Sequence, residues 1–551
     1  MREKAATGSP TSATKKAGKP SKSRSAVDPT TILRLRWTVH ELPSSQHRAG
    51  LAGLALCVRF LELKPHRKGT CTIDTIDNDA LTLAVDRDGM QSLFDDIYAA
   101  TYVEVQSRSK WKGDEPKRIS EVEETDEKTG KTKREKRFVY DRVVPAGALI
   151  DDWESGESGS PRLWLKLWRD LVWTTLRGVP AQREPFNARA DKREIDDGGE
   201  AWDELAAKPN ARAALASTHA LGAQAKSAEN VAFEDITRFR FLLNFWPFAV
   251  AIYVPAILQR DGKRDFVGHA VAVPDVVALD DFLAVWDRLV RGRSGEASGY
   301  VPRDAVIDLA AEAGLDVVWR SAEIIRTRQG MSLRSVLSAV DVFHVEKDGN
   351  NVRIRGVARV VPLRPQINEY ARVRNAGYWS PVFRRQRIGN VLEEQRWWSG
   401  FARLCSTTTA ETTIRHSAFR HDCRLAFTEV EMKDDVPEEE WTLEHLVYKR
   451  VYAYVYGKLD RKYKLSWEGV KGNAELEKDY REKREKVVRE AFLAVRSRSC
   501  SDFVAYFTST ICSVPRHVSE AKFVELAGAL MDKDRREDIR SLTLLALSAV
   551  A

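Results

Sequence analysis

The sequence predicts an α+β fold, with a mixed N-terminal α/β body followed by a C-terminal helical bundle. Stretches that alternate apolar and polar residues, as half-buried strands do, lie far apart over the first two-thirds of the chain and are mixed with helical patterns. Beyond residue 432 the apolar spacing is helical throughout. A chain of 551 residues, 43% of them hydrophobic, is long enough for a large core and suggests two to four domains.

Residues 1–28 form a basic tail. The first 27 residues hold seven Lys or Arg against Glu3, a net charge of +6, whereas the whole chain carries +8. Ser, Thr, Gly, Pro and Lys dominate this segment, which therefore cannot bury enough apolar surface to offset the entropy of ordering and is predicted to be disordered. Since the remainder nets only +2, a case for nucleic-acid binding depends on how charge is arranged in the folded part.

The N-terminal body is expected to span residues 29–345 and to begin with strand, helix, strand. TTILRLRWTVHEL (30–42) and DALTLAVD (79–86) alternate as strands do, and between them ELPSSQHRAGLAGLALCVRFLEL (41–63) reads as a helix that follows Pro43. Ser44 or Ser45 is placed to cap its first turn. Small residues such as Ala49 and Gly53, one turn apart, would let another backbone approach closely.

Three polar residues at the mouth of this helix are candidates for binding an anion such as the phosphate of a nucleic acid: Gln46, His47 and Arg48. Amide dipoles at a helix N-terminus favour anions such as phosphate. The alternative is an ordinary capped core helix with a solvated end. A membrane span is excluded because the apolar run is too short for a bilayer and Arg59 interrupts it.

A charge-dense excursion over residues 107–142 is predicted to be a long hairpin, with Gly130 in the left-handed position of its turn. Because it is polar on both faces, it cannot be core. It either extends into water or contacts a charged partner, and four of its cations are candidates for gripping duplex phosphates: Lys110, Lys112, Lys117 and Arg118.

The remainder of the body is predicted to mix helix and strand. PRLWLKLWRDLVWTTLRG (161–178) has helical apolar spacing, with its three tryptophans mainly in the core and Gly178 as the stop. We expect an exposed loop around 179–194, which carries Arg183, Arg189, Lys192 and Arg193. FLLNFWPFAVAIYVPAIL (241–258) is interpreted as a doubly buried strand pair broken by Pro247, and FVGHAVAVPDV (266–276) as another strand.

Residues 346–431 form an arginine-rich region that is predicted to face nucleic acid. Between Val352 and Ile388 nine arginines stand against one acid, Glu369, with Tyr370, Tyr378 and Trp379 interleaved. Guanidinium groups grip phosphate bidentately and aromatic rings stack on bases. A solvated, arginine-rich sheet edge is the alternative. The candidate residues are Arg353, Arg355, Arg359, Arg372, Arg374, Arg384, Arg385 and Arg387.

The C-terminal region, residues 432–551, is predicted to be a small helical bundle. We expect a start near Asp435, a tyrosine-rich helix to about Tyr456, a long helix over 475–498, one over 501–512 and two after Ser519. Its basic side chains are nearly balanced by acids, so this region adds little to the nucleic-acid case by itself.

Catalytic motifs are absent from the sequence: no P-loop, GxSxG, HExxH or EF-hand pattern occurs. Cys405, His416, His421 and Cys423 are zinc-type ligands without the spacing of a known finger, and His421-Asp422 is a weak hint of an HD nuclease. We expect no metal, no cofactor and no catalytic residue. Six scattered cysteines without a CxxC pair indicate a reduced cytoplasmic protein.

Five blocks together resemble a known family: ELPSSQHRAGLAGL, RFVYDRVVPAGALI, LWLKLWRDLVWTTLRGVPAQREPF, LGAQAKSAENVAF and IYVPAIL. They are similar to the large subunit of type I CRISPR surveillance complexes (Cascade), in its Myxan-type branch. The resemblance runs from about residue 33 to 280 and is thinner afterwards.

The resemblance implies a non-catalytic subunit that binds double-stranded DNA carrying a protospacer-adjacent motif (PAM), supports R-loop formation and recruits a helicase-nuclease or transposition proteins in trans. Implied partners are crRNA, target DNA with its displaced strand, and the backbone, crRNA-end and small helical subunits. A stand-alone metal-dependent nuclease or RNA-processing enzyme is the alternative. The resemblance also leads to the hypothesis that a separate 120-residue small subunit starts at Met432.

Overall fold

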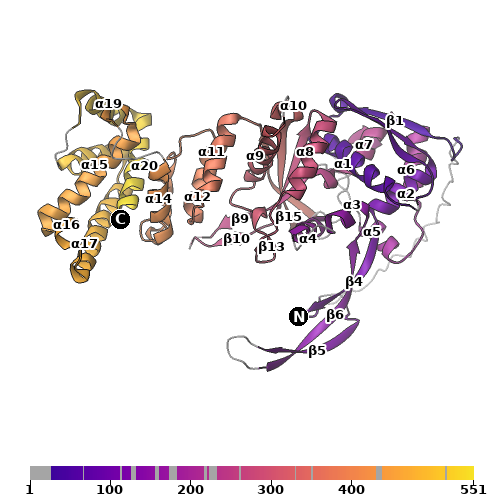
Figure 1. The fold of residues 1–551 in the computed structure, drawn as a ribbon, viewed down its shortest axis with the longest axis horizontal. Coiled ribbons are helices and arrows are strands. Elements are labelled where there is room, and N and C mark those ends of the chain that lie inside the picture. The colour runs from indigo at the N-terminus through magenta and orange to yellow at the C-terminus, as the bar shows by residue number, and fades with distance from the viewer. Residues whose placement is uncertain are drawn as a thin grey trace, which may run out of the picture.

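A computed structural model shows an elongated molecule with the N-terminal body at one end and the C-terminal helices at the other (Figure 1). It describes residues 27–65, 67–111, 115–125, 132–154, 160–172, 183–215, 220–222, 233–259, 262–328, 331–348, 351–429, 437–514 and 518–551. The last strand of the described part ends at Val360, and helices make up the regular structure after it. The predicted α+β class is confirmed.

A small antiparallel sheet opens the N-terminal body, with the strand order β1-β3-β2. Both predicted strands are present: β1 (Leu33–Thr38) and β3 (Ala80–Val85) pair along their whole length, and β2 (Cys71–Ile76) completes the sheet. Helix α2 (Arg87–Ile97) follows, capped by the Asp86 carboxylate, which accepts from the Gly89 amide.

Helix α1 (Ser45–Glu62) is the predicted opening helix, and almost every side chain from Ser45 to Val58 is buried. A Cβ on Gly53 would overlap the carbonyl oxygen of Phe245, and one on Gly50 would overlap that of Leu242. The small residues therefore serve close backbone packing, as the sequence predicted. The cap differs from the prediction, because the Ser44 hydroxyl bonds the His47 ring rather than a first-turn amide.

The central sheet joins residues from both halves of the chain in the order β10-β9-β11-β15-β16. Its bounds are β10 (Arg264–Phe266), β9 (Ala251–Leu258), β11 (His269–Val276), β15 (Leu337–Asp348) and β16 (Asn351–Val360), with β14 (Val306–Ile307) parallel to β9. The register of β16 against β15 shifts where His344 faces Gly356 and Val345 faces Ile354, so Gly356 lies at an irregularity of the pairing. Helices α8 (Leu279–Arg291) and α9 (Glu312–Arg326) follow β11 in the chain.

Two predictions for the body were wrong. Residues 241–258 form one strand, not two: helix α7 (Thr237–Leu242) and the 3-10 turn η3 (Trp246–Ala249) precede β9, and Pro247 lies in the first turn of η3, where proline is tolerated. The expected loop is helix α5 (Arg183–Ala190), which buries Phe186. In the first segment the rings of Phe241 and Phe245 stand at helical spacing, and in the second the Phe186 ring packs against Tyr98.

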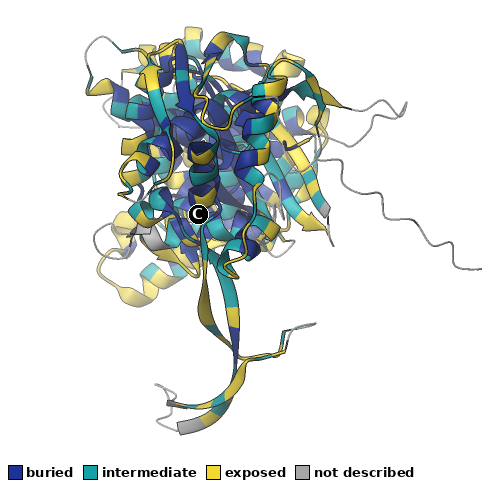
Figure 2. Cartoon of the chain, turned by 90° about the vertical axis from the view of Figure 1, so that its right-hand side faces the viewer, coloured by how far each residue is buried: buried dark blue, intermediate teal, exposed yellow. Residues whose placement is uncertain are grey.

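A three-stranded arm projects from the body, as Figures 1 and 2 show. Its order is β4-β6-β5, with β4 (Ala100–Ser107), β5 (Arg118–Thr125) and β6 (Thr132–Pro145) all antiparallel. The predicted hairpin is thus present, and its turn, with Gly130, lies outside the described residues. Helices α3 (Ala148–Glu154), α4 (Ser160–Asp170) and α6 (Asp197–Ala207) and the strand pair β7 (Arg212–Ala214) and β8 (Glu234–Ile236) complete the body.

The described part of the tryptophan helix faces the core. In α4 Trp168 is buried and Trp164 is half-buried, while Trp173 and Gly178 lie outside the described residues. The Trp164 and Trp168 indole nitrogens donate to the carbonyls of Ser294 and Pro247, at 3.1 and 2.9 Å. The two described rings therefore anchor the helix.

The C-terminal end is the predicted helical bundle, built around α20 (Lys533–Val550), which is buried from Ile539 onward. The other longer helices are α11 (Arg364–Asn375), α12 (Pro381–Leu392), α13 (Phe401–Thr407), α14 (Ser417–Glu429), α15 (Leu443–Lys458), α17 (Ala474–Ser497), α18 (Cys500–Ser509) and α19 (Glu520–Met531). Helices α13 and α14 pack on α20 together with α15 and α17. The bundle therefore includes helices that precede Met432, which itself lies outside the described residues.

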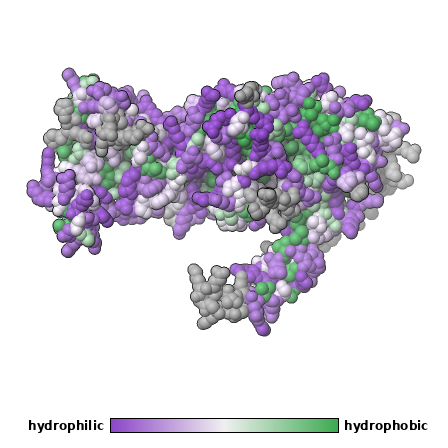
Figure 3. All heavy atoms as spheres, in the orientation of Figure 1, coloured by the Kyte–Doolittle hydropathy of each residue, from purple (hydrophilic) through white to green (hydrophobic). Residues whose placement is uncertain are grey.

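The face of the molecule in Figure 3 is predominantly hydrophilic. Among the described residues, no helix combines the length and apolar character that a bilayer crossing requires.

Candidate nucleic-acid interface

The polar mouth of α1 turns inward. Gln46 is buried, and its side-chain amide both donates to the Leu221 carbonyl and accepts from the Leu221 amide, at 3.1 and 2.8 Å. His47 is also buried, with Nε2 2.7 Å from the Asp235 carboxylate and Nδ1 2.7 Å from the Ser44 hydroxyl. Both side chains fix neighbouring segments to the helix, so the alternative of an ordinary core helix describes them better than a phosphate site.

Arg48 and Arg359, two candidates far apart in the sequence, share one carboxylate. Asp275 at the end of β11 forms an ion pair with Arg48 and another, of 2.5 Å, with Arg359, and it accepts from the Ser338 hydroxyl at 2.6 Å. Although burial opposes its charge, these donors hold the pKa of Asp275 below the ordinary value. The two arginines therefore tie α1 to the sheet.

The arm presents exposed cations in ion pairs at its surface. Lys117 lies 3.2 Å from Glu104 and 3.0 Å from Asp141, and Arg118 lies 2.6 Å from Glu104. Ion pairs between side chains this exposed to water are weak, so phosphate could compete for these cations. Lys110 is exposed, and Lys112 lies outside the described residues.

Four of the nine arginines of the block are built into the fold. Arg384 pairs with Asp308 and Glu312, at 2.5 Å each, and Arg374 pairs with Asp316 at 2.7 Å. Arg385 donates to the carbonyls of Ala256 and Asp308, at 3.0 and 2.5 Å. Arg387 is 3% exposed and lies 2.8 Å from Glu369. The expectation that these four side chains face a polyanion does not fit their burial.

The acidic partners of Arg374 and Arg384 lie in α9 and in the segment before it. The Asp316 carboxylate is 1% exposed, pairs with Arg320 and Arg374, and accepts from the hydroxyls of Tyr253 and Tyr370 at 2.8 and 3.2 Å. Burial opposes its charge, but the two guanidinium groups hold the pKa of Asp316 below the ordinary value. Acids outside the arginine-rich segment thus neutralise it, which a local charge count does not reveal.

The rest of the block remains on the surface. Arg353 and Arg355 on β16 face Glu346 at 4.0 and 2.7 Å and are 63% and 38% exposed, and Arg372 on α11 is 73% exposed. They form separate surface positions. Of the interleaved rings, Tyr370 and Tyr378 are buried and Trp379 is 66% exposed.

The possible metal ligands have other roles. Cys405 and Cys423 are buried, and the His421 ring stacks on Trp379 with centroids 3.9 Å apart. Asp422 accepts from the amides of Trp379 and Ser380 at 3.0 and 2.6 Å, and so fixes the N-terminus of α12. Within the described residues no group of three or more His, Cys, Asp or Glu is arranged to hold a metal ion.

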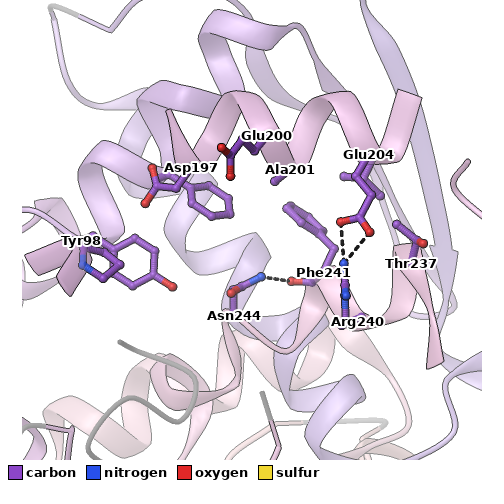
Figure 4. Close-up of a pocket in the computed structure, with 12 residues that line it drawn as sticks. Tyr98, Asp197, Glu200, Ala201, Glu204, Thr237, Arg240, Phe241 and Asn244 are labelled. Carbon is purple, nitrogen blue, oxygen red and sulfur yellow. Dashed lines mark hydrogen bonds and ion pairs between the residues drawn. The ribbon is translucent and has the colours of Figure 1, made fainter. Parts of the chain in front are cut away.

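One pocket of the body, of about 300 Å³, is unsuited to phosphate because acids line it (Figure 4). Its wall includes Asp197, Glu200 and Glu204 of α6 beside aromatic side chains. Glu204 pairs with Arg240 at 2.5 Å and Asp197 with Arg189 at 2.7 Å, and among the described lining residues three acids stand against one cation, Arg240, so the pocket disfavours an anion.

A second groove has the composition that single-stranded nucleic acid requires. This tyrosine groove, of about 420 Å³, is lined by Tyr448, Tyr452 and Tyr456 of α15, by Arg424 of α14 and by Arg484 of α17, and its lining among the described residues includes no acid. The Tyr452 and Tyr456 rings lie 4.2 Å apart, and Tyr448 follows at 6.4 Å. Stacked rings beside guanidinium groups suit bases and phosphates together.

The basic character continues past the end of α15. The π-helical turn η7 (Leu459–Tyr463) carries exposed Arg461 and Lys462, and Lys464 follows in the left-handed conformation at φ 58°. Lys462 and Lys483 lie over the Tyr463 ring, at 5.2 and 5.7 Å from its centroid. Lys483 is next to Arg484 on α17, so this cluster adjoins the tyrosine groove.

Two family models match the chain. The N-terminal domain of type I-B CRISPR Cas8b matches residues 70–331, and the C-terminal domain of Cas8b matches residues 337–550. The chain belongs to the Cas8b family. No curated protein matches it. It is therefore a large subunit of a type I CRISPR system, a component of antiviral defence, as the resemblance predicted at that level.

The two Cas8b matches meet between residues 331 and 337, at the start of β15, so the central sheet contains strands from both matched stretches. The tyrosine groove belongs entirely to the C-terminal match. Sequence reasoning noted a tyrosine-rich helix there but gave it no role, because aromatic rings at helical spacing are usually core. The sequence pattern that could have indicated the groove is three tyrosines, each four residues after the last, on one helix. The other face of that helix carries the buried residues Leu446, Val447 and Val451.

Proposed function

We propose that this Cas8b chain is the non-catalytic large subunit of an RNA-guided surveillance complex. In that complex it binds PAM-containing double-stranded DNA, supports R-loop formation, and recruits a helicase-nuclease or transposition proteins that act in trans. Its partners are crRNA, both target strands, and the backbone, crRNA-end and small helical subunits. Guide pairing supplies most of the sequence information, so the protein needs phosphate grips and a path for the displaced strand rather than a catalytic site.

The tyrosine groove is the observation that carries this proposal. It offers three rings at one-turn spacing and two arginines without an acid among its lining residues, on the surface of the helical bundle. Base–aromatic stacking contributes about 1–3 kcal/mol per base and tolerates any sequence. A displaced strand of arbitrary sequence requires that tolerance. The arm, with Lys110, Lys117 and Arg118, is the duplex-facing element in this proposal, and the exposed Arg353, Arg355 and Arg372 extend the cationic surface.

The test is equilibrium binding of a fluorescent 20-nucleotide dT strand and of a 20-base-pair duplex to the full chain. Tyr452→Leu keeps an apolar side chain without the stacking ring, and we expect it to weaken binding of the single strand about 5- to 100-fold with little effect on the duplex. Lys117→Gln combined with Arg118→Gln should weaken binding of the duplex with little effect on the single strand. It should also lower the slope of the logarithm of the binding constant against the logarithm of the salt concentration by about one to two. Arg403→Gln, an exposed arginine outside both surfaces, is the matched control.

Equal weakening of both ligands by Tyr452→Leu, or none, would overturn the assignment of the groove to single strands. Unchanged duplex binding in the arm variant would remove the arm from the duplex-facing surface. If the wild-type chain binds neither nucleic acid at physiological salt, the proposal as a whole is contradicted.

A separate small subunit that starts at Met432 remains part of the proposal, with a consequence for its packing. Such a product would lack α13 and α14, which cover part of the buried helix α20. The small subunit would therefore need another protein surface to cover that part of α20. Expression with a C-terminal tag should give a second band of 120 residues that disappears in Met432→Leu, and a single band would count against internal initiation.

A further inference from the structure

A second large groove lies between the C-terminal end of α9 and the start of α11. Its volume is about 800 Å³, and four arginines line it: Arg326, Arg328, Arg334 and Arg364. The one acid in the lining, Glu323, pairs with Arg326 at 2.8 Å. We name this feature the arginine groove. Its charge favours an anionic occupant.

The guanidinium groups of this groove stay accessible. Arg326 is 76% exposed, and Arg334 and Arg364 are exposed as well. Arg334 makes a single long contact, in which Nε donates to the Pro362 carbonyl at 3.3 Å. In contrast to Arg374 and Arg384, which are buried among acids of α9, these arginines lie at the surface next to a cavity.

The floor of the groove is aliphatic. Ile325, Met331, Leu333, Leu363 and Ile367 line it with two prolines, and none of the described lining residues is aromatic. Stacking platforms for bases use aromatic rings, as the tyrosine groove does. Leucine, isoleucine and methionine instead accept the apolar anchors of a protein segment, and methionine adapts to anchors of different shape.

The start of α11 also favours a protein segment that carries carboxylates. The helix has 12 residues, Leu363 caps it without a side-chain bond, and its first turn contains no acid. A carboxylate beside this end would meet both the helix dipole and the Arg364 guanidinium. Arginine-lined cavities with a buried apolar centre have the composition of protein-binding hot spots.

We propose that the arginine groove is a docking site for an acidic, amphipathic segment of a partner protein. In this arrangement aliphatic anchors of the segment fill the floor while Asp or Glu side chains pair with Arg328, Arg334 and Arg364. The proposal is independent of the nucleic-acid role of the tyrosine groove. It differs from that role in ligand class, because phosphate chains lack the apolar anchors that the floor accepts.

The experiment measures binding of a fluorescent peptide, Ac-EDLLEELIDDLLEE-amide, to the full chain by anisotropy at physiological salt. Two probes accompany it: the same peptide with every acid replaced by Gln, and a 14-nucleotide dT strand. We expect the acidic peptide to bind at least tenfold more tightly than the Gln peptide. Arg364→Gln combined with Arg328→Gln should weaken it about tenfold or more, since it removes two guanidinium partners of the peptide carboxylates.

A second variant tests the floor, and a third serves as the control. Leu333→Ser should weaken the acidic peptide several-fold without changing binding of the dT strand, whereas Arg403→Gln should change neither. Thermal unfolding of each variant confirms that it is folded. Equal binding of the acidic and Gln peptides overturns the proposal. The proposal is also overturned if the Arg328 and Arg364 double variant loses dT binding but retains peptide binding, because the groove would then be a nucleic-acid site.

Discussion

Replacement of Arg384 by methionine tests whether the arginine block stabilises the fold or binds nucleic acid. Methionine retains much of the volume and removes the charge. The Asp308 and Glu312 carboxylates are each 1% exposed, and Arg384 contacts both. Asp308 keeps a second partner, Arg264 at 2.9 Å, so the uncompensated charge falls mainly on Glu312.

Breaking one buried pair while leaving its acid in place costs about 3–5 kcal/mol. For a cooperative unit of about 150–250 residues this lowers the melting temperature by roughly 6–20 °C. Burial opposes the charge of Arg384, but its two acidic neighbours raise its pKa above the ordinary value, so the guanidinium stays charged wherever the protein is folded. The loss of stability in Arg384→Met should therefore be the same across the neutral pH range.

The matched control is Arg372→Met, also from the arginine block. Arg372 is 73% exposed and pairs with Glu369 only at 3.4 Å, so its loss should change stability by less than about 1 kcal/mol. Urea unfolding gives the stability of both variants, and anisotropy with a dT strand gives the binding of each folded protein. An Arg384→Met protein that is as stable as wild type but binds the strand more weakly would refute the structural role.

Two further predictions concern packing and pH. Gly53→Ala should lower the free energy of unfolding by about 1–3 kcal/mol, because its Cβ overlaps the Phe245 carbonyl. Gly528→Ala, in open space on α19, should raise the free energy of unfolding by about 0.5–1 kcal/mol. Urea unfolding midpoints measure both changes. Burial, and then His344, lower the pKa of His269 to about 4 from 6.5. The unfolded chain therefore takes up the proton first, and stability falls as pH drops from about 6.5 to 4, by on the order of 1 kcal/mol per unit. His269→Gln should reduce that fall, and an unchanged pH profile in the variant would contradict this origin.

The sequence predicted most of the elements because their patterns are local. Alternation identified β1 and β3, a buried apolar run identified β11, and helical spacing identified α1 and the C-terminal helices. Residues 241–258 were interpreted wrongly because a continuous apolar run fits a buried strand and a buried helix equally well.

The candidate site was harder to predict because charge pairing is not local. Arg374 and Arg384 looked unpaired in their own segment, yet their partners, Asp316 and Asp308, lie about sixty to eighty residues earlier. Arg48 and Arg359 meet at Asp275 only once the sheet is assembled. A run of arginines thus indicates the sign of the charge in a segment and not its exposure.

The tyrosine groove shows the opposite case, in which a tertiary arrangement gives a common pattern a new role. Tyrosines at i, i+4 and i+8 on one helix are normally core residues. Here α14, α17 and α20 approach that face and leave a cavity with two arginines in its lining. Neither the distance between helices nor the placement of Arg424 opposite the rings follows from the sequence.

The most direct test of the account is site-specific crosslinking in the assembled complex, with p-benzoylphenylalanine in place of Tyr452. Tyr452 lines the groove and is 42% exposed, so the photoreactive ring can face a bound strand. The account predicts crosslinks to the displaced strand that require a matching guide and an intact PAM. Crosslinks to the paired strand alone, or equal crosslinks without a matching guide, would contradict it.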